Sequence, residues 1–476
     1  MNNNNHKLLT NKEKFSFLGG GIGKDMACSI IYGFYTFYLT AIQGLDPLVV
    51  GIAFFLARIW DAINDPMMGF IIENTRTRFG KFRPWIAIGT LLTAIIIIIM
   101  FVDVDFSMTG KYIYYIGFYV LWSMAYTLMD VPYWSMLPVL SKTVDERNSL
   151  ATWTRLATGL GGTIVSIFTP IVIVNLFQSE YNSKAYFYIA IFIAVSFIIL
   201  EYFTVRNTKE KVNINLPKVK LSDIKIVLSK NDQLITFFLI MVIFLSGTGI
   251  SGAFNIYYFS YDLGLFNVMG IYAVFCGIIP VIFMVFFPVL AKKLSRRKIF
   301  IIAVILGMIG FSGMFLMGTF FGGNLILLGI FNVMVGICNS MVSLLMSIML
   351  ADTVDYGEYK VGIRTDSIVF SLQPFLYKFS SAISVLVLGI GLKIAKIPEI
   401  GNLTREQFEV IKASIPDSAF VMIRILMFAV PIIFLLISLL IYMKKFKLNG
   451  DYLTNMNLEL DQLRATADAP KDEIIK

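Results

Sequence analysis

The feature that most constrains this chain is a series of long, uninterrupted apolar runs. Residues 84–102, PWIAIGTLLTAIIIIIMFV, include no charged side chain. A helix needs about 20 apolar residues to cross the hydrocarbon core of a bilayer, and buried helices of soluble proteins rarely carry such a run. Because the runs are continuous and do not alternate, they predict helices rather than the strands of a barrel. We therefore expect an all-α polytopic membrane protein.

Composition supports this expectation and excludes a water-soluble globule. Only 15% of the 476 residues are charged and 57% are hydrophobic, whereas soluble domains carry about 25% charged residues. Apolar runs bounded by charges or Gly/Pro clusters predict twelve transmembrane helices, at residues 21–42, 47–72, 84–102, 112–137, 152–175, 185–203, 234–259, 267–290, 299–320, 324–350, 368–391 and 418–443.

The basic residues are divided unequally between alternate loops. Most of the 40 Lys and Arg residues fall in the N-terminal segment, the loops after even-numbered spans and the C-terminal tail. By the positive-inside rule these parts face the cytoplasm, so both termini are expected there, in a multi-pass protein of the cell membrane. The net charge of +9 does not indicate a nucleic-acid partner, because the basic residues form no single patch.

The longest basic loop between predicted spans follows the sixth span, so it divides the twelve spans into two sets of six. It predicts an N-terminal six-helix bundle at 1–203, a cytoplasmic linker at 204–233, a C-terminal six-helix bundle at 234–443 and a cytoplasmic tail at 444–476 that ends as a short surface helix. Basic turns lie at corresponding places in the two halves, ENTRTRFGKFRPW and AKKLSRRKIF. Such positional symmetry is typical of transporter repeats.

Ionisable residues inside the spans are the informative ones. Each costs about 2.5 to 3.5 kcal/mol to insert, so those that remain mark a pathway or a binding site. The single histidine, His6, lies in the polar N-terminus, and the three cysteines lack metal-ligand spacing. No bound cofactor or zinc site is expected, so chemistry within the membrane has to use carboxylates, lysine or arginine.

The second span carries two carboxylates four residues apart, Asp61 and Asp65, with Asn64 beside them. One helical turn places them on the same face. Together with a hydroxyl such as Thr127 from another span, they offer the hard oxygen ligands that a bare sodium ion needs, or they share a proton. The alternative is an internal ion pair with Arg58, one turn earlier, and both interpretations can hold together.

The fourth span places Asp130 one turn after Tyr126 and one turn before Trp134. Sugars suit such a site, because aromatic rings cover the apolar face of a pyranose while charged groups bond its hydroxyls. The alternative is structural charge pairing with aromatic packing. Three further polar side chains are expected to complete the pocket: Asp25, Tyr32 and Arg155.

Four motifs carry a resemblance to a known family. DAINDPMMGF, TRTRFGKFRPW, YTLMDVPYWSMLP and ADTVDYGEYK resemble the glycoside-pentoside-hexuronide:cation symporters, and the melibiose transporters among them in particular. The resemblance implies a transporter rather than an enzyme, with the major facilitator fold of two six-helix bundles. It also implies alternating access that couples sugar uptake to the entry of sodium, lithium or protons.

The resemblance also implies roles for individual residues. The implied sugar site comprises Lys24, Asp25, Tyr126, Asp130, Trp134 and Arg155. The implied cation site comprises Asp61, Asn64, Asp65 and Thr127, and Lys378 is placed between the two sites. The implied cytoplasmic gate comprises Arg147, Arg296, Arg297, Asp352, Asp355 and Arg364, for which an ordinary positive-inside role is the alternative.

Two departures from the family pattern leave the sugar open. Ser343 stands where melibiose transporters have a pocket tryptophan, and Pro374 replaces a threonine one turn from the membrane lysine. Two other functions are also considered. A passive sugar facilitator needs neither carboxylate of the second span, and an intramembrane aspartyl hydrolase would require Asp61 and Asp130 to meet around one water.

Overall fold

The computed structural model describes residues 9–141, 143–211, 230–270, 272, 283, 293–321, 324–362, 366–397 and 405–467. The chain divides into two compact units. The first comprises Met1–Leu216, Gly252–Gly277 and Ala382–Arg424, and the second comprises Pro217–Ser251, Ile278–Ser381 and Ile425–Lys476. Both units are built from helices, and the fold class expected from the apolar runs is confirmed.

Four of the six helices that the N-terminal half contributes to the first unit begin at a residue whose side chain caps the helix. Thr10 and Glu13 form a reciprocal capping box at the start of the first helix, Asp46 caps the second and Ser107 caps the fourth. Each cap satisfies main-chain N–H groups that have no partner within the helix. The helices are α1 (Asn11–Ile30), α2 (Pro47–Asn74), α3 (Arg83–Met100), α4 (Met108–Leu140), α5 (Val144–Phe177) and α6 (Ser183–Asn207), and two short π-helical segments follow α1 at Ile31–Tyr35 and Tyr38–Ile42.

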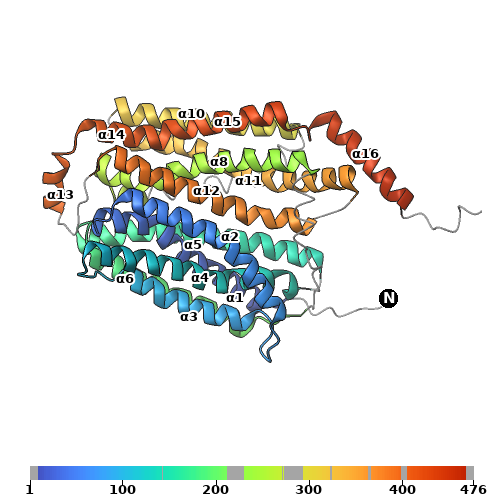
Figure 1. The fold of residues 1–476 in the computed structure, drawn as a ribbon, viewed down its shortest axis with the longest axis horizontal. Helices are drawn as coiled ribbons and strands as arrows, with labels where there is room; N and C mark the ends of the chain where they lie inside the picture. Colours follow the sequence, from blue (N-terminus) through green and yellow to red (C-terminus); the bar gives the residue numbers. More distant parts are fainter. Residues whose placement is uncertain are drawn as a thin grey trace, which may run out of the picture. The chain divides into compact units, whose positions relative to one another are not determined.

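Close backbone approach lets α1 pack tightly against its neighbours. It packs along α5 and α6, while α3 packs along α4 and α6, and Figure 1 shows these helices side by side. A Cβ atom added at Gly161 of α5 would lie only 2.3 Å from the carbonyl oxygen of Ile22 on α1. Glycine therefore allows the two main chains to touch, which brings polar groups of α1 against α5.

Two segments from later in the chain complete the first unit. They contain the end of α8 (Asp232–Tyr257) with a π-helical segment at Tyr258–Asp262, the end of α12 (Asp366–Ile394), α13 (Arg405–Lys412) and α14 (Asp417–Arg424). Thr40 Oγ1 lies 2.7 Å from Tyr257 Oη, and Lys393 forms an ion pair with Asp46. These contacts lie at helix ends that adjoin the loops poor in basic residues. The first boundary between the units, at 216/217, falls inside the predicted linker at 204–233, and the predicted domain bounds stay a prediction.

The second unit is organised around the pair α10 (Arg296–Phe320) and α11 (Leu325–Val361). A π-helical segment at Ile425–Ala429 leads into α15 (Val430–Lys445), which packs on α10 through the rings of Phe300 and Tyr442, 4.2 Å apart. The predicted short helix of the tail is present as α16 (Gly450–Ala467), and it contacts α11. Leu453, Met456 and Leu460 are its buried apolar side chains, at 8%, 3% and 2% exposure.

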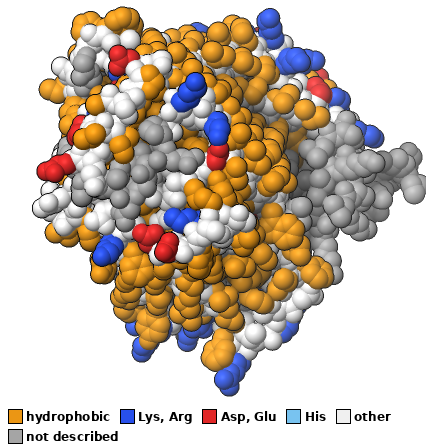
Figure 2. All heavy atoms as spheres, turned by 60° about the vertical axis from the view of Figure 1, so that its left-hand side comes forward, with side chains coloured by type: hydrophobic (Ala, Val, Ile, Leu, Met, Phe, Trp, Pro, Cys, Tyr) orange, Lys and Arg blue, Asp and Glu red, His pale blue; other side chains and the backbone are white. Residues whose placement is uncertain are grey.

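Nine helices in the described part of the chain are long and apolar enough to cross a membrane. Large apolar side chains such as Ile113 and Leu176 are more than 70% exposed, and hydrophobic side chains cover much of the face in Figure 2. Such a surface is stable in lipid and costly in water. The predicted span at 267–290 lies almost entirely outside the described residues, so the total of twelve spans stays a prediction.

Candidate functional site

The two carboxylates of α2 face α4, as their spacing predicts. Thr127 Oγ1 donates a hydrogen bond to Asp65 Oδ1 at 3.1 Å, and Ser123 Oγ donates to Asp61 Oδ1. Asp61 and Asp65 are one helical turn apart on α2, and Ser123 and Thr127 are one turn apart on α4. The two hydrogen bonds between these helices therefore also lie one turn apart. We call this group of four side chains the acidic ladder. Ser123 was not identified from the sequence, although it precedes Thr127 by four residues.

The predicted ion pair with arginine is present beside the acidic ladder. Arg58 Nη1 lies 3.6 Å from Asp61 Oδ2, and both side chains are 4% exposed. Arg58 also donates a hydrogen bond to Tyr32 Oη, and its guanidinium lies 4.0 Å from the centre of the tyrosine ring. Tyr32 is therefore held by Arg58 at the acidic ladder. Two carboxylates, one arginine and two hydroxyls thus lie together where α2 meets α4.

Asn64 adds a further polar group on the same helix. Its Nδ2 atom is buried and has no hydrogen-bond partner among the described residues. A side-chain amide can also present its oxygen to a cation. Asn64, the two carboxylates and the hydroxyls of the acidic ladder can therefore supply oxygen ligands, because a hydroxyl that turns its proton away leaves its oxygen free for a cation.

A second polar cluster joins α1 to α4. Lys24 Nζ lies 2.5 Å from Asp130 Oδ1 and 3.5 Å from Tyr126 Oη. The lysine is 4% exposed, whereas the side chain of Asp130 is 26% exposed. The pair is thus closed on the lysine side and accessible on the aspartate side, where a ligand hydroxyl can reach the carboxylate.

Aromatic rings surround the ammonium group of Lys24. The ring centres of Trp134, Tyr133 and Tyr126 lie 5.0, 5.6 and 5.8 Å from Nζ. The predicted spacing of Tyr126, Asp130 and Trp134 on one face of α4 is therefore confirmed, and Tyr133 is an addition that the sequence analysis did not identify. A charged pair beside aromatic faces can bond hydroxyls and cover the apolar face of a sugar ring.

The remaining polar residues expected in this pocket lie on α1 and α5. Asp25 is partly buried against Gly161 and Gly162 of α5, where a Cβ atom added at Gly162 would lie 3.1 Å from Asp25 Oδ2. Arg155 lies on α5 two turns before Gly162, and its side chain is exposed. Asp25 is thus held between two helices of the first unit, while Arg155 is available to a ligand.

Helix α4 carries residues of both groups. Ser123 and Thr127 belong to the acidic ladder, whereas Tyr126 and Asp130 belong to the cluster with Lys24. The ring of Trp122 stacks on that of Tyr126 at 5.4 Å. A movement of α4 therefore changes both groups together.

The residues predicted to form a cytoplasmic gate are only partly paired as expected. In the second unit Arg296 forms an ion pair with Asp352, while Asp355 is held 3.0 Å from Arg464 of the tail helix. Arg297 is exposed and Arg147 of the first unit is partly buried. Arg364 lies outside the described residues. The part played by Arg464 could not be identified from the sequence.

Two further predicted positions lie in the second unit. Lys378 is partly buried on α12, and its placement between the sugar and cation sites stays a prediction. Ser343 Oγ lies 3.3 Å from Tyr377 Oη, and the tyrosine is 42% exposed. An aromatic side chain from the neighbouring helix therefore lies beside the position where the resemblance implies a tryptophan.

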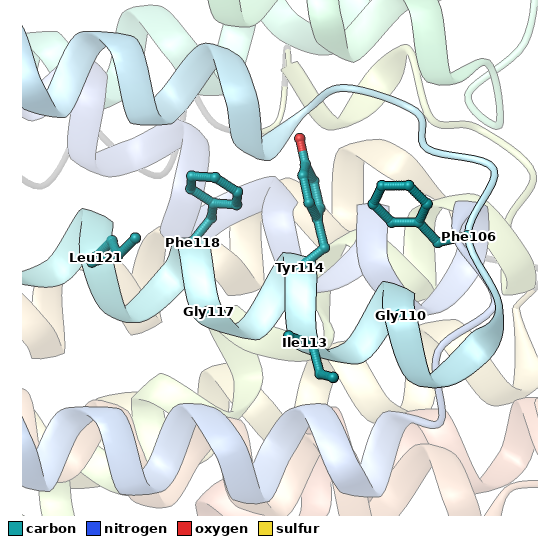
Figure 3. A pocket seen from close by; sticks show the side chains of 7 residues that line it. All are labelled: Phe106, Gly110, Ile113, Tyr114, Gly117, Phe118 and Leu121. Atoms are coloured by element: carbon teal, nitrogen blue, oxygen red, sulfur yellow. The ribbon is translucent and has the colours of Figure 1, made fainter.

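A shallow hollow lies elsewhere on α4, and Figure 3 shows the seven residues that line it, from Phe106 to Leu121. Its lining is almost entirely apolar, and the hydroxyl of Tyr114 donates to the carbonyl oxygen of Ile99. Such a surface suits lipid chains and offers no partners for sugar hydroxyls. The acidic ladder and the cluster of Lys24 with Asp130, to which other side chains of α4 contribute, remain the candidate site.

Comparison with known proteins identifies the class of protein. Residues 16–450 match the model of the MFS/sugar transport protein family, so the chain belongs to this family, and the resemblance to the glycoside-pentoside-hexuronide:cation symporters is confirmed. It is 29% identical to a raffinose carrier protein of Pediococcus pentosaceus, over 99% of this chain and 74% of the relative. It is 28% identical to an isoprimeverose transporter of Lactiplantibacillus pentosus, over 79% of each.

The fold agrees with this assignment. A partially occluded inward open structure of the xylose transporter XylE from E. coli superposes with a TM-score of 0.62, at 13% identity, over 92% of this chain and 98% of that one. The protein is therefore a sugar transporter of the major facilitator superfamily and not an enzyme. The aspartyl hydrolase alternative is wrong, and Asp61 and Asp130 each have their own basic partner.

Proposed function

We propose that this protein is a symporter that couples uptake of a glycoside to entry of sodium, lithium or protons, by alternating access. Both termini face the cytoplasm in this proposal, and no resident cofactor takes part. The acidic ladder binds the cation, and the cluster of Lys24 and Asp130 binds one ring of the sugar.

The observation that carries the proposal is that two carboxylates lie one turn apart on α2 and that each accepts a hydrogen bond from a hydroxyl of α4. Asp61 is 3% exposed and also lies 3.6 Å from Arg58. Carboxylates inside a bilayer are costly and usually mark a binding site or a pathway. Carboxylate and hydroxyl oxygens are the ligands that a small hard cation prefers, and a passive facilitator would not require them.

Coupling between the two ligands follows from their shared helix. A cation that draws Asp65 and Thr127 together fixes α4 against α2, and the same helix presents Asp130 to the sugar. Each ligand then favours the arrangement that the other one needs, which is a linkage between two binding free energies. The cation thereby raises the affinity for the sugar.

Alternating access is supported by the contacts within the first unit. Segments of α8 and α12 pack on N-terminal helices through Thr40 with Tyr257, and through Asp46 with Lys393. These contacts lie at the side predicted to face outward, so they form a candidate outer closure. In the second unit, the ion pair of Arg296 with Asp352 adjoins a basic loop of the kind predicted to face the cytoplasm.

The sugars after which the relatives are named indicate the class of sugar to test. Raffinose and isoprimeverose are both glycosides of more than one ring. The first unit offers Asp130, Trp134 and Arg155 for one ring, and the resemblance implies that the position of Ser343, where melibiose transporters have a tryptophan, affects the second. We expect selection of the first ring to be stricter than selection of the second.

Counterflow in liposomes tests this function. Purified protein is reconstituted and exchange of labelled raffinose, isoprimeverose, lactose and melibiose is measured under sodium, lithium and proton gradients. Exchange of at least one sugar that responds to one of the three cations supports symport. Exchange that ignores all three gradients would establish a passive facilitator instead.

A further inference from the structure

Glu201 of α6 carries a buried carboxyl group to which the proposed transport cycle assigns no role. The residue is 1% exposed, and neither oxygen of its carboxyl group has a hydrogen-bond partner among the described residues. An ionised carboxylate without a partner costs several kcal/mol at such a place. In this conformation the group is therefore stable only when it carries a proton.

The neighbouring helix is shaped to accept this carboxyl group. A Cβ atom added at Gly20 of α1 would lie 2.8 Å from Glu201 Oε2 and 2.2 Å from Thr204 Oγ1. The hydroxyl proton of Thr204 is directed to the carbonyl oxygen of Ser16, at 2.8 Å. Glycine at position 20 therefore leaves room on α1 for the carboxyl group of Glu201.

Lys24 connects Glu201 with the candidate sugar site. It follows Gly20 by one turn, about 5.4 Å along the same face of α1. Side chains on a helix lean toward its N-terminus, so the stem of Lys24 runs back over Gly20. The ammonium group, 2.5 Å from Asp130 and also near Asp25, acts electrostatically on Glu201 as well.

The groups around Glu201 come from several helices. Lys24 and Asp130 act on it electrostatically, and it acts in turn on Tyr133. Arg83 of α3 approaches the next turn of α6, where its Nε donates to the carbonyl oxygen of Val205 at 2.7 Å. On α5, the side chains that approach α1 at Gly21 are two threonines, Thr154 and Thr158. Lys24 is thus the cation available to Glu201.

We propose that Glu201 is a proton-binding site that shares Lys24 with Asp130. While Lys24 pairs with Asp130, Glu201 holds a proton. When sugar hydroxyls donate to Asp130, Lys24 turns to Glu201, the carboxyl O–H bond breaks, and water in the pocket accepts the proton. The net charge of the site becomes more negative by one unit. The sugar hydroxyls stabilise the carboxylate of Asp130, from which Lys24 has moved away. This coupling rests on the proposed sugar site, whereas the proton on Glu201 does not.

Infrared spectroscopy tests the proton without any sugar. The intact protein should show the carbonyl band of a protonated carboxyl group, and Glu201→Gln should lose it. Glu180→Gln is the matched control, because Glu180 is also buried, at 4% exposure, and it should leave the band unchanged. Asp130→Asn should also remove the band, because Lys24 then pairs with Glu201. A spectrum unchanged in Glu201→Gln would overturn the proposal.

Calorimetry tests the coupling to sugar. Raffinose binding is measured in buffers of different ionisation heat. The intact protein should release up to one proton per sugar, and its affinity should rise by up to tenfold per pH unit, whereas Glu201→Gln should show neither effect. Equal proton release by both proteins would refute the coupling. If raffinose does not bind at all, the proposed substrate fails, while the infrared result still decides the proton site.

Discussion

Replacement of Asp130 by alanine tests the pocket and its energetics together. The change leaves Lys24, whose side chain is 5% exposed, without its carboxylate. Loss of one partner of a buried ion pair costs about 3 to 5 kcal/mol, but water reaches the 26% exposed Asp130 and Lys24 can turn to Glu201, so we expect about 2 to 3 kcal/mol. Affinity for raffinose should fall about tenfold or more, because the hydroxyls lose a charged acceptor.

A double variant separates the two effects. Lys24→Met with Asp130→Ala removes both charges, so stability in a thermal unfolding assay should recover while raffinose affinity stays low in calorimetry. Asp105→Ala, at an exposed carboxylate of the α3–α4 loop, is the control and should change stability by less than about 0.5 kcal/mol. Full raffinose affinity in Asp130→Ala would refute the site, and a double variant no more stable than the single one would refute the role of the pair.

Three further outcomes are expected. Burial alone would raise the pKa of Asp46, but hydrogen bonds from Lys393 and two main-chain N–H groups hold it below its usual value. The ionised Asp46 carboxylate stabilises the folded protein above the unfolded pKa of about 3.9, and this stabilisation is lost as pH falls through the lowered folded pKa. Because Asp46→Asn removes the titrating group, the variant should lose less thermal stability on acidification than the unmodified protein. Arg464→Ala should make the tail helix more sensitive to protease, because it removes the bonds to Asp355 and Glu358, and an unchanged cleavage rate would count against this contact. Ser343→Trp should change the ranking of glycosides in competition assays by adding aromatic surface, and an unchanged ranking in a folded protein would exclude this position from the sugar site.

Local spacing predicted much of the first unit correctly. The interval of four between Asp61 and Asp65 predicted a shared face, and the structure places both against hydroxyls of α4. The same interval predicted the row of Tyr126, Asp130 and Trp134. Such predictions succeed because the period of a helix is fixed by backbone geometry and does not depend on the rest of the fold.

Other features depend on which helices meet, and spacing alone does not determine this. The partnership of Lys24 with Asp130 joins residues that are 106 positions apart, and Arg464 reaches Asp355 from a tail whose docking site has no local signal. Glu201 lies near the end of the predicted span 185–203, where a carboxylate can reach water. The helix continues to Asn207, and packing on α1 buries the residue.

The most direct test of the account is the effect of sodium on sugar binding in Asp65→Asn. The acidic ladder predicts that calorimetry with raffinose will show sodium-stimulated affinity in the unmodified protein, and cation-independent binding of lower affinity in the variant. Asp61→Asn should behave in the same way, and lithium and protons are to be compared where sodium gives no stimulation. Normal cation stimulation in both variants would contradict the account.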